Sequence, residues 1–203
     1  IYKKLSTSYK TLNDVCNGYV GRGKSTSESA IVGKDIRKFG YKDHKLPTEG
    51  NTLFIQNIYS AEAGIIAAFG GNLEASQTVT VFTDGDPKMC HYILGILHSR
   101  LCNLFLYKYC YNYSKLTMHT DAKYLKKIPL PSRKLQDQYF EQILELVNRL
   151  ESDDYMSQAW FNRLEQLNQI IYSAYNITKK ESDFIDSEMK KIQSKRWIVD
   201  GQL

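Results

Sequence analysis

The stretch Thr78–Phe105, TVTVFTDGDPKMCHYILGILHSRLCNLF, contains the change of pattern that decides the fold. Its first five residues alternate in type, which is typical of a half-exposed strand. Asp84-Gly85-Asp86-Pro87 is a strong turn signal. After the turn, apolar residues recur at three- and four-residue spacing, which predicts one helix over residues 89–111 with a broad apolar face. The recurring residues are Ile93, Leu94, Leu97, Leu101, Leu104 and Phe105.

Further strands are predicted on either side of this stretch. Residues 53–59 (LFIQNIY) and 63–69 (AGIIAAF) are rich in β-branched and apolar residues, and a Gly-Gly-Asn turn follows the second run. Residues 116–119 could form a short strand. Ile128-Pro129-Leu130-Pro131 stops any helix and favours an extended boundary.

Beyond that boundary the pattern is helical. Apolar periodicity predicts helices over residues 135–150 and 157–175, and Thr178 with Glu181 forms a capping box that opens a third helix. We therefore predict an α+β fold: a mixed twisted β-sheet domain with one long packed helix over residues 1–131, followed by a C-terminal helical segment over residues 132–203.

Composition indicates an ordinary soluble globular protein, with 42% hydrophobic and 24% charged residues among 203. The longest apolar run, residues 63–69, is far shorter than the ~20 residues of a membrane span, and no signal peptide is recognisable. The cysteines form no C-x-x-C pair, which favours reduced thiols, a cytoplasmic location and no structural zinc. They are Cys16, Cys90, Cys102 and Cys110. The first residue is Ile1, so we expect a fragment of a longer enzyme.

Positive charge is concentrated in the first part of the chain. Residues 1–131 carry 17 Lys and Arg against 10 Asp and Glu, a net of +7, whereas residues 132–203 carry 10 against 12, a net of −2. Such an excess is expected of a module that contacts phosphates. The alternative interpretation is an ordinary solvated surface enriched in Lys.

Gly18–Ser25, GYVGRGKS, satisfies the G-x-x-x-x-G-K-S pattern of nucleotide hydrolases. That loop requires a buried strand before it and a helix after it. Here the preceding residues are polar and the following Ser-rich piece announces no long helix. The competing interpretation is a flexible loop in which Arg22 and Lys24 contact DNA phosphates.

Tyrosines and amides supply further candidates. Tyrosines at 107, 109, 111 and 113 alternate with other residues, and such rings either stack on bases or lie half-buried with the hydroxyl outward. We predict half-burial for most of them and name Tyr113 as a candidate reader of bases. Gln56 and Asn57 interrupt an apolar strand, where they either read adenine or form a structural amide pair.

Catalytic and metal-binding residues are not evident. His91 and His98 lie two helical turns apart, but a third metal ligand is missing from the pattern. Asp84 and Asp86 belong to a turn. The sequence contains neither a nucleophile elbow nor a convincing dyad, so we predict no catalytic residue and no metal site.

Four segments, in the same order, resemble the C-terminal specificity domain of adenine-N6 DNA methyltransferases. Val32–Phe39 (VGKDIRKF) resembles its G-K-D-I segment. Ile93–Leu101 (ILGILHSRL) resembles its I-L-G-I-L-N-S helix, with His98 where Asn is usual. Tyr124–Pro131 (YLKKIPLP) resembles its closing strand, and Leu167–Glu181 (LNQIIYSAYNITKKE) resembles its C-terminal helix pair.

The resemblance implies a TaqI-like target-recognition domain of a restriction-modification enzyme. It implies that this chain has no catalytic residue and no cofactor, because S-adenosylmethionine binding and the Asn-Pro-Pro-aromatic motif belong to an N-terminal methyltransferase domain of the same polypeptide. That parent enzyme would flip and methylate an adenine, with or without an endonuclease activity. The implied partners are double-stranded DNA and the methyltransferase domain, with no membrane.

The predicted DNA-binding residues combine phosphate contacts and readers. The phosphate contacts are Arg22, Lys24, Lys34, Arg37, Lys38, Lys115 and Lys123, and the candidate readers are Gln56, Asn57 and Tyr113. Two alternatives stay open: a nucleotide-hydrolysing domain built on Gly18–Ser25, and a protein-assembly module in which the basic charge is incidental.

Overall fold

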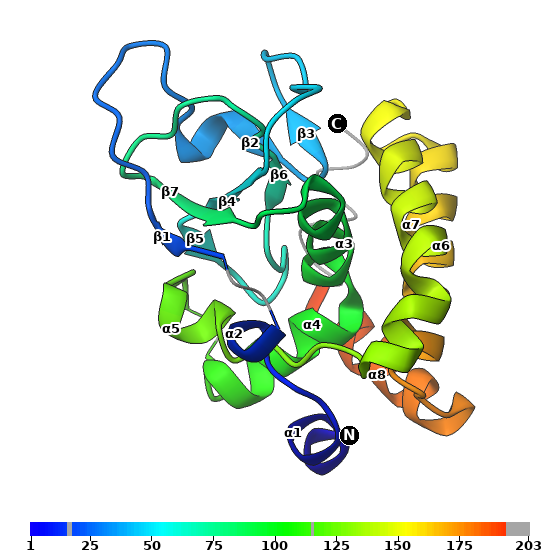
Figure 1. Cartoon of the computed structure of the whole chain (residues 1–203). Coiled ribbons are helices and arrows are strands. Elements are labelled where there is room, and N and C mark those ends of the chain that lie inside the picture. Colours follow the sequence, from blue (N-terminus) through cyan, green and yellow to red (C-terminus); the bar gives the residue numbers. More distant parts are fainter. Residues whose placement is uncertain (16–17, 115, 194–203) are drawn as a thin grey trace.

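The computed structural model describes residues 1–15, 18–114 and 116–193, and its fold is α+β as predicted (Figure 1). The helices are α1 (Tyr2–Ser8), α2 (Leu12–Val15), α3 (Pro87–His98), α4 (Arg100–Phe105), α5 (Ala122–Leu125), α6 (Arg133–Ser152), α7 (Gln158–Ala174) and α8 (Lys179–Gln193). The strands are β1 (Val20–Arg22), β2 (Ile36–Arg37), β3 (Gly40–Tyr41), β4 (Thr52–Gln56), β5 (Ile58–Tyr59), β6 (Ala67–Phe69), β7 (Val79–Thr83) and β8 (Met118–His119). Two short helical turns complete the set, the 3₁₀ turn η1 (Gly33–Asp35) and the π-helical turn η2 (Leu106–Cys110).

A four-stranded sheet with the order β1-β7-β4-β6 forms the centre of the first part of the chain. All its neighbouring strands are antiparallel. Two further antiparallel pairs, β2-β3 and β5-β8, flank it. Among the described residues, parallel pairing is confined to one isolated bridge between Ile31 and Ala75. This order places β1 and β6 at opposite edges of the sheet.

The predicted single helix over residues 89–111 is divided, which corrects the sequence interpretation. Ser99 adopts an extended conformation between α3 and α4, and its hydroxyl accepts a hydrogen bond from the Cys102 amide at 3.1 Å. A serine that caps a new helix competes with continuation of the old one. Asn168 of α7 strengthens the break, since its Oδ1 accepts from the Arg100 amide at 2.8 Å.

The predicted strands are shorter than their apolar runs. Residues 53–59 split at Asn57 into β4 and β5, and only Ala67–Phe69 of the second run is a strand. Gly64, at φ +70°, forms a bridge with Ser60 at the end of the turn that precedes that strand. The three C-terminal helices are confirmed, and Thr178 and Glu181 exchange the hydrogen bonds of a capping box. The sequence analysis did not predict α1 or α2.

Helices α6 and α7 pack on the side of α3 that faces away from the sheet (Figure 1). Gly95 makes this possible, because a Cβ there would lie 2.9 Å from Ile143 and 3.0 Å from Val147. One hydrophobic core contains residues from both parts of the chain, such as Leu97 and Trp160. The division into two domains at residue 131 stays a prediction.

Membrane spans and disulfides were also considered. Within residues 1–15, 18–114 and 116–193, no helix is both long and apolar enough to cross a bilayer. Cys90, Cys102 and Cys110 are not joined by disulfides, and Cys16 lies outside the described residues.

Candidate nucleic-acid interface

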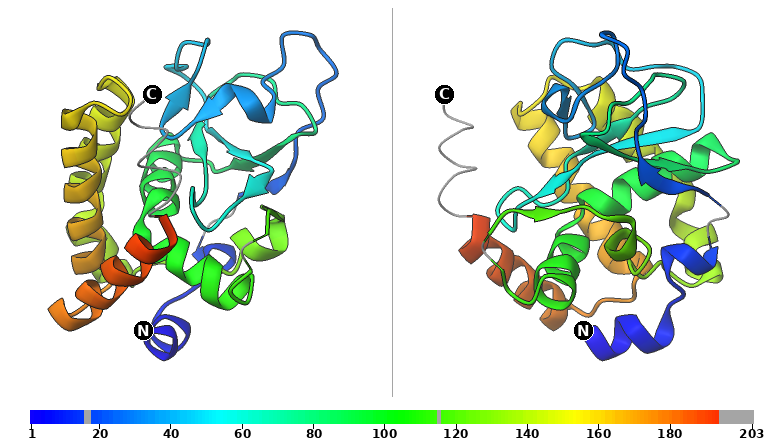
Figure 2. Two further views of the ribbon diagram at one scale, coloured as in Figure 1. Left: turned by 180° about the vertical axis from the view of Figure 1, so that it is seen from behind. Right: turned by 90° about the vertical axis from the view of Figure 1, so that its left-hand side faces the viewer.

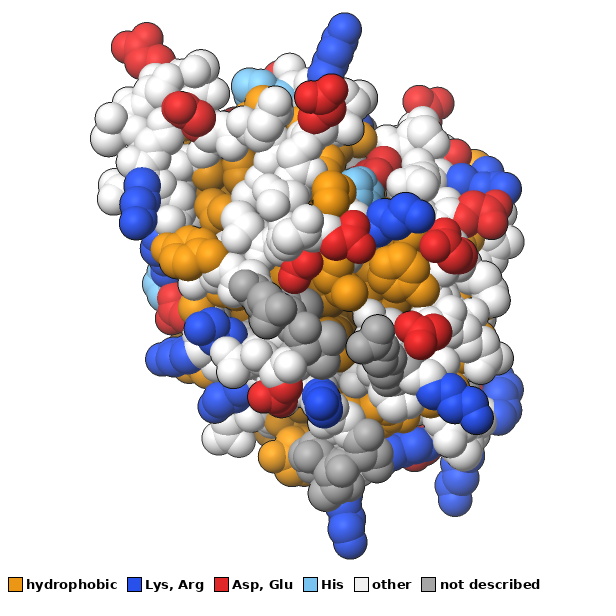
Figure 3. Space-filling model, viewed as in Figure 1, with side chains coloured by type: hydrophobic (Ala, Val, Ile, Leu, Met, Phe, Trp, Pro, Cys, Tyr) orange, Lys and Arg blue, Asp and Glu red, His pale blue; other side chains and the backbone are white. Residues whose placement is uncertain are grey.

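Five cations from three segments meet around α5. We call this group the basic patch: Lys10, Arg22, Lys123, Lys126 and Lys127. The segment before α2 lies against the chain that follows α5, because the Leu130 amide donates to the Lys10 carbonyl at 2.8 Å. Figure 2 (right) faces this side, with β1 above α5. Figure 3 shows Lys and Arg side chains gathered at the lower left of the molecule, over α5 and α2.

Arg22 fixes β1 to the start of α5. Its Nη2 donates to the Asp121 carboxylate at 2.8 Å, and Asp121 is the residue that precedes α5. Its Nη1 is buried and has no hydrogen-bond partner among the described residues. The side chain remains 38% exposed. Arg22 therefore anchors the patch and still reaches solvent.

Lys123, Lys126 and Lys127 point outward because their neighbours point inward. Leu125 and Ile128 are buried, and the three lysines between and before them are exposed. Lys123 lies over the Tyr124 ring, with Nζ 4.7 Å from its centroid. In the part of the chain that the structure describes, Lys126 and Lys127 form no ion pair. Three like charges are thus left to attract an anion.

Lys24 and Lys34 lie at the end of the sheet, beside the loop 74–78. Lys24 is exposed and precedes Ser25, whose amide donates to the Ala75 carbonyl at 3.0 Å. Lys34 is exposed and follows Gly33, whose amide donates to Thr78 Oγ1 at 3.0 Å. Acidic side chains accompany them, Glu28 in the same loop and Glu74 in hydrogen bond with Ser25. This end of the sheet carries mixed charge, unlike the basic patch.

Arg37 and Lys38 lie elsewhere. Strand β2 contacts β6, at the sheet edge opposite β1, and the Arg37 guanidinium lies 4.8 Å from the ring centroid of Tyr155 in the helical segment. Lys38 is buried, at 7% exposure, and burial with the Arg100 charge lowers its pKa to about 8. A buried ammonium cannot reach a phosphate, so the sequence prediction for Lys38 is wrong.

The two amides of LFIQNIY have internal environments. Gln56 Nε2 donates to the Ile36 carbonyl at 2.8 Å, a contact that favours the structural interpretation. Asn57 marks the break between β4 and β5, and its backbone carbonyl accepts from the Thr120 amide at 3.1 Å. Its Oδ1 is buried with no hydrogen-bond partner among the described residues. Base reading by either amide stays a prediction.

The tyrosine series divides into two groups. Tyr107 and Tyr111 are buried, and the Tyr111 hydroxyl donates to the His119 carbonyl at 2.9 Å. Tyr109 and Tyr113 are 39% and 53% exposed. Tyr113 therefore stays available to a ligand. Lys115, the remaining predicted contact, lies outside the described residues.

Three members of the basic patch were missed by the sequence analysis: Lys10, Lys126 and Lys127. The adjacent pair Lys126-Lys127 lies inside YLKKIPLP and was the one available signal. Lys10 had none, because backbone contacts between segments far apart in the chain, such as the Leu130 amide to the Lys10 carbonyl at 2.8 Å, bring it to α5.

The nucleotide-loop alternative is wrong. Residues 20–22 of GYVGRGKS form strand β1, which pairs antiparallel with β7, and no helix follows Ser25 before the short turn η1. A phosphate-cradling loop needs a loop at those glycines and a helix N-terminus after them. A groove of about 560 Å³ lies between α3 and α6 instead, and none of its lining residues comes from Gly18–Ser25.

The histidines have packing roles. His98 is buried, and its Nε2 accepts from the Ala67 amide at 3.1 Å; burial and the Lys38 charge lower its pKa. His91 Nε2 lies 3.4 Å from the Glu151 carboxylate. Burial alone would lower the pKa of His91, but the hydrogen bond and charge of Glu151 outweigh it and the pKa is raised. Among the described residues, no cluster of three His, Cys, Asp or Glu could hold a metal ion.

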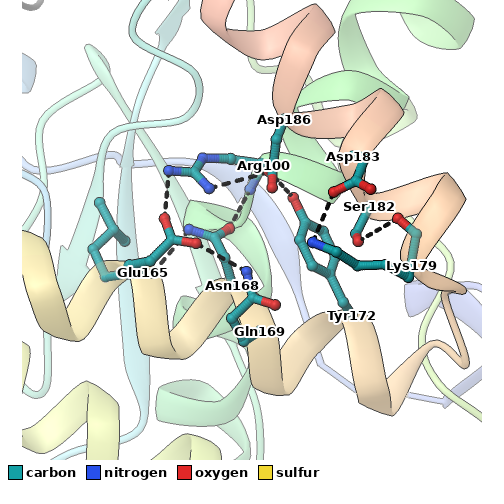
Figure 4. Close-up of polar contacts among 10 residues, drawn as sticks. Arg100, Glu165, Asn168, Gln169, Tyr172, Lys179, Ser182, Asp183 and Asp186 are labelled. Atoms are coloured by element: carbon teal, nitrogen blue, oxygen red, sulfur yellow. Dashed lines mark hydrogen bonds and ion pairs between the residues drawn. The ribbon is translucent and has the colours of Figure 1, made fainter.

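A polar network joins α4 to the C-terminal helices (Figure 4). Arg100 lies 2.6 Å from Glu165 of α7 and 3.1 Å from Asp186 of α8. The Tyr172 hydroxyl donates to the same Asp186. Burial would lower the pKa of Arg100, and its carboxylate partners outweigh this and raise it. We call Arg100, Glu165, Asn168, Tyr172 and Asp186 the polar network.

Comparisons with known proteins add little to this description. No protein-family model matches the sequence, and no curated protein matches it. Among solved structures, the chain is similar to the type IIL restriction-modification enzyme MmeI in complex with DNA, with a TM-score of 0.46 and 14% sequence identity. The similarity covers 74% of this chain and 22% of that enzyme, so the chain spans less than a quarter of its length. At this TM-score the proposal below rests on the residues of the chain itself.

Proposed function

We propose that this chain binds duplex DNA and contacts its phosphates through the basic patch. The observation that carries the proposal is the convergence of five cations from three separate segments on one surface. Among the described residues, the ion pair of this group is Arg22 with Asp121, and Asp14 is a further acid near Lys10. Phosphate contacts supply affinity and position the protein without reading sequence. The remaining candidates for further contacts lie outside the patch and are Lys24, Lys34, Arg37, Gln56, Asn57 and Tyr113.

The finer proposal is a target-recognition domain of an adenine-N6 DNA methyltransferase in a restriction-modification system, without catalysis of its own. The four family-like segments of the sequence support it. YLKKIPLP forms the end of α5 and contributes two lysines of the basic patch, and ILGILHSRL forms the junction of α3 and α4. S-adenosylmethionine binding and methyl transfer would belong to an N-terminal methyltransferase domain of the same polypeptide.

The decisive experiment measures affinity for a duplex of random sequence as a function of salt. Each phosphate contact contributes about 0.9 to the slope of log K against log salt, so three or four contacts predict a slope of about −3. Lys126→Glu should weaken binding and reduce the slope by about 1 or more. Lys88→Glu, an equal charge change at an exposed lysine on α3, is the matched control and should leave the slope unchanged.

Two results would contradict the proposal. A slope of zero would favour the protein-assembly alternative, because binding would not involve phosphates. Equal effects of Lys126→Glu and Lys88→Glu would show that net charge, rather than the basic patch, governs binding. Selection from a random duplex library tests the finer proposal, which requires enrichment of a short sequence that contains adenine.

A further inference from the structure

Four partly exposed aromatic rings gather around Lys108. We call them the aromatic shelf: Tyr2, Tyr109, Tyr113 and Phe184. Their exposed fractions lie between 39% and 53%, and among the described residues only Tyr19 and Phe161 are other exposed aromatics. Exposed apolar residues are normal when scattered, whereas a contiguous group marks a binding surface.

The rings come from three elements and contact one another or the same lysine. Tyr2 of α1 stacks on Tyr109 of η2, with centroids 4.2 Å apart and planes at 28°. Lys108 Nζ lies 4.8 Å from the Phe184 centroid on α8 and 5.5 Å from that of Tyr113. The shelf therefore combines residues of α1, η2, α8 and the turn after η2, and α1 and α8 both lie in the lower part of the molecule (Figure 2, left).

The backbone holds Tyr113 outward at an energetic cost. Asn112 and Tyr113 have φ values of +47° and +59°, a region that bulky residues rarely occupy. The Tyr113 amide donates to the Tyr107 carbonyl at 2.8 Å, which closes the chain after the π-helical turn. Strained backbone of this kind concentrates at functional sites, and π-helical turns do so too.

The shelf adjoins the basic patch. The Tyr111 ring, next to the shelf residues in η2, packs on the Tyr124 ring beside Lys123, with centroids 4.7 Å apart. The Lys127 charge acts on Cys110, the residue after Tyr109. The basic patch and the aromatic shelf are therefore neighbouring surfaces, and a strand of nucleic acid that leaves the patch can reach the rings.

We propose that the aromatic shelf stacks unpaired bases of a single-stranded DNA segment that continues from the duplex on the basic patch. This inference rests on the proposed function. Base stacking on aromatic side chains tolerates any sequence and works beside cations that hold the backbone.

The charged residues at the shelf disfavour a protein partner. The central part of a protein–protein interface is depleted of charged residues. Here Lys108 forms an ion pair with Glu188 at 2.8 Å in the middle of the rings, and Lys4 pairs with Glu181 at 2.9 Å beside Tyr2. Three of the four rings are also tyrosines, whose hydroxyls suit a wet surface.

The test compares three DNA probes at constant salt by fluorescence anisotropy: a blunt duplex, the same duplex with a single-stranded dT overhang, and the dT strand alone. We expect the overhang to improve affinity about tenfold, and Tyr113→Ala to abolish that gain, so that this variant binds the blunt and the overhang duplex equally well. Tyr113→Phe keeps the ring and should retain the gain. Phe161→Ala removes an exposed ring on α7 and is the control.

Each outcome separates this inference from the proposed function. If the blunt duplex binds with the expected salt dependence but the overhang adds nothing, the shelf proposal is overturned and the proposed function stands. If none of the three probes binds, both fall. If Tyr113→Ala and Phe161→Ala weaken overhang binding equally, the rings act through stability and the stacking proposal is wrong; thermal melting of each variant identifies that case.

Discussion

The basic patch and the polar network use charge in opposite ways. In the polar network the guanidinium of Arg100 has two carboxylate partners, and the Tyr172 hydroxyl donates a hydrogen bond to one of them, Asp186. In the basic patch, among the described residues, only Arg22 forms an ion pair, and the charge of Lys10 acts on the nearby Asp14 carboxylate. Paired charges join segments of the fold, whereas adjacent unpaired cations repel one another and have no structural reason to be together. We therefore expect substitutions in the polar network to change stability and substitutions in the basic patch to change DNA binding.

The largest expected effect breaks the hydrophobic core at the start of α7. Trp160 is fully buried, 5.2 Å from Tyr155 between ring centroids, and Trp160→Ala should lower the free energy of unfolding by about 3–5 kcal/mol. Phe161→Ala, its exposed neighbour, is the control. Urea unfolding measures the free energy of unfolding of both variants. Equal losses would show that α7 does not bury the face that carries Trp160.

The next effect removes the centre of the polar network. Arg100→Met should lower the free energy of unfolding by about 1–3 kcal/mol, because the carboxylates lose their cation in a partly buried site. Arg149→Met is the matched control, since Arg149 forms only an exposed pair with Glu145 on the same helix and should contribute about 0.5 kcal/mol or less. A drop in DNA affinity without loss of stability would contradict the division between the two regions.

Substitutions in the basic patch should lower DNA affinity and leave stability almost unchanged. Lys126→Gln with Lys127→Gln should weaken duplex binding about tenfold at physiological salt, and the free energy of unfolding should change by about 0.5 kcal/mol or less. The same double change at Lys42 and Lys45, exposed in the β3–β4 loop, serves as control. A large drop in the free energy of unfolding of the Lys126 and Lys127 variant, with little change in its DNA affinity, would contradict the comparison.

The smallest effect concerns pH. The folded pKa of His91 is raised above its ordinary value of 6.5 by Glu151, against the opposing effect of burial. The protonated pair therefore stabilises α3 on α6 below pH 6.5, and this contribution is lost as pH rises through the folded pKa. Wild type should exceed His91→Gln in unfolding free energy at acidic pH, and the difference should vanish at alkaline pH. A difference that grows with pH would show that neutral His91 makes the stabilising contact.

The elements that local pattern governs were predictable. Periodic apolar residues announced α3, α6 and α7, and Thr178 with Glu181 announced the start of α8, because these signals act within a few residues of the chain. The break between α3 and α4 at Ser99 was not predictable from the sequence. A serine inside an apolar helix pattern becomes a cap only when a partner such as Asn168 accepts a hydrogen bond from the freed amide of Arg100. Helix α1 carries no comparable periodic signal, and its Tyr2 ring packs on distant Tyr109.

The α+β class, the helical C-terminal part and the excess of cations before residue 131 follow from the order of the residues, because composition and periodicity are properties of the chain alone. Which of these cations share a surface depends on the tertiary structure. It buried Lys38 near Arg100, separated Arg37 from Arg22 across the sheet, and placed the segment of Lys10 against the segment that contains Lys126. Side-chain direction depends on which strand edge or helix face meets a neighbour, and that pairing joins residues far apart in the chain.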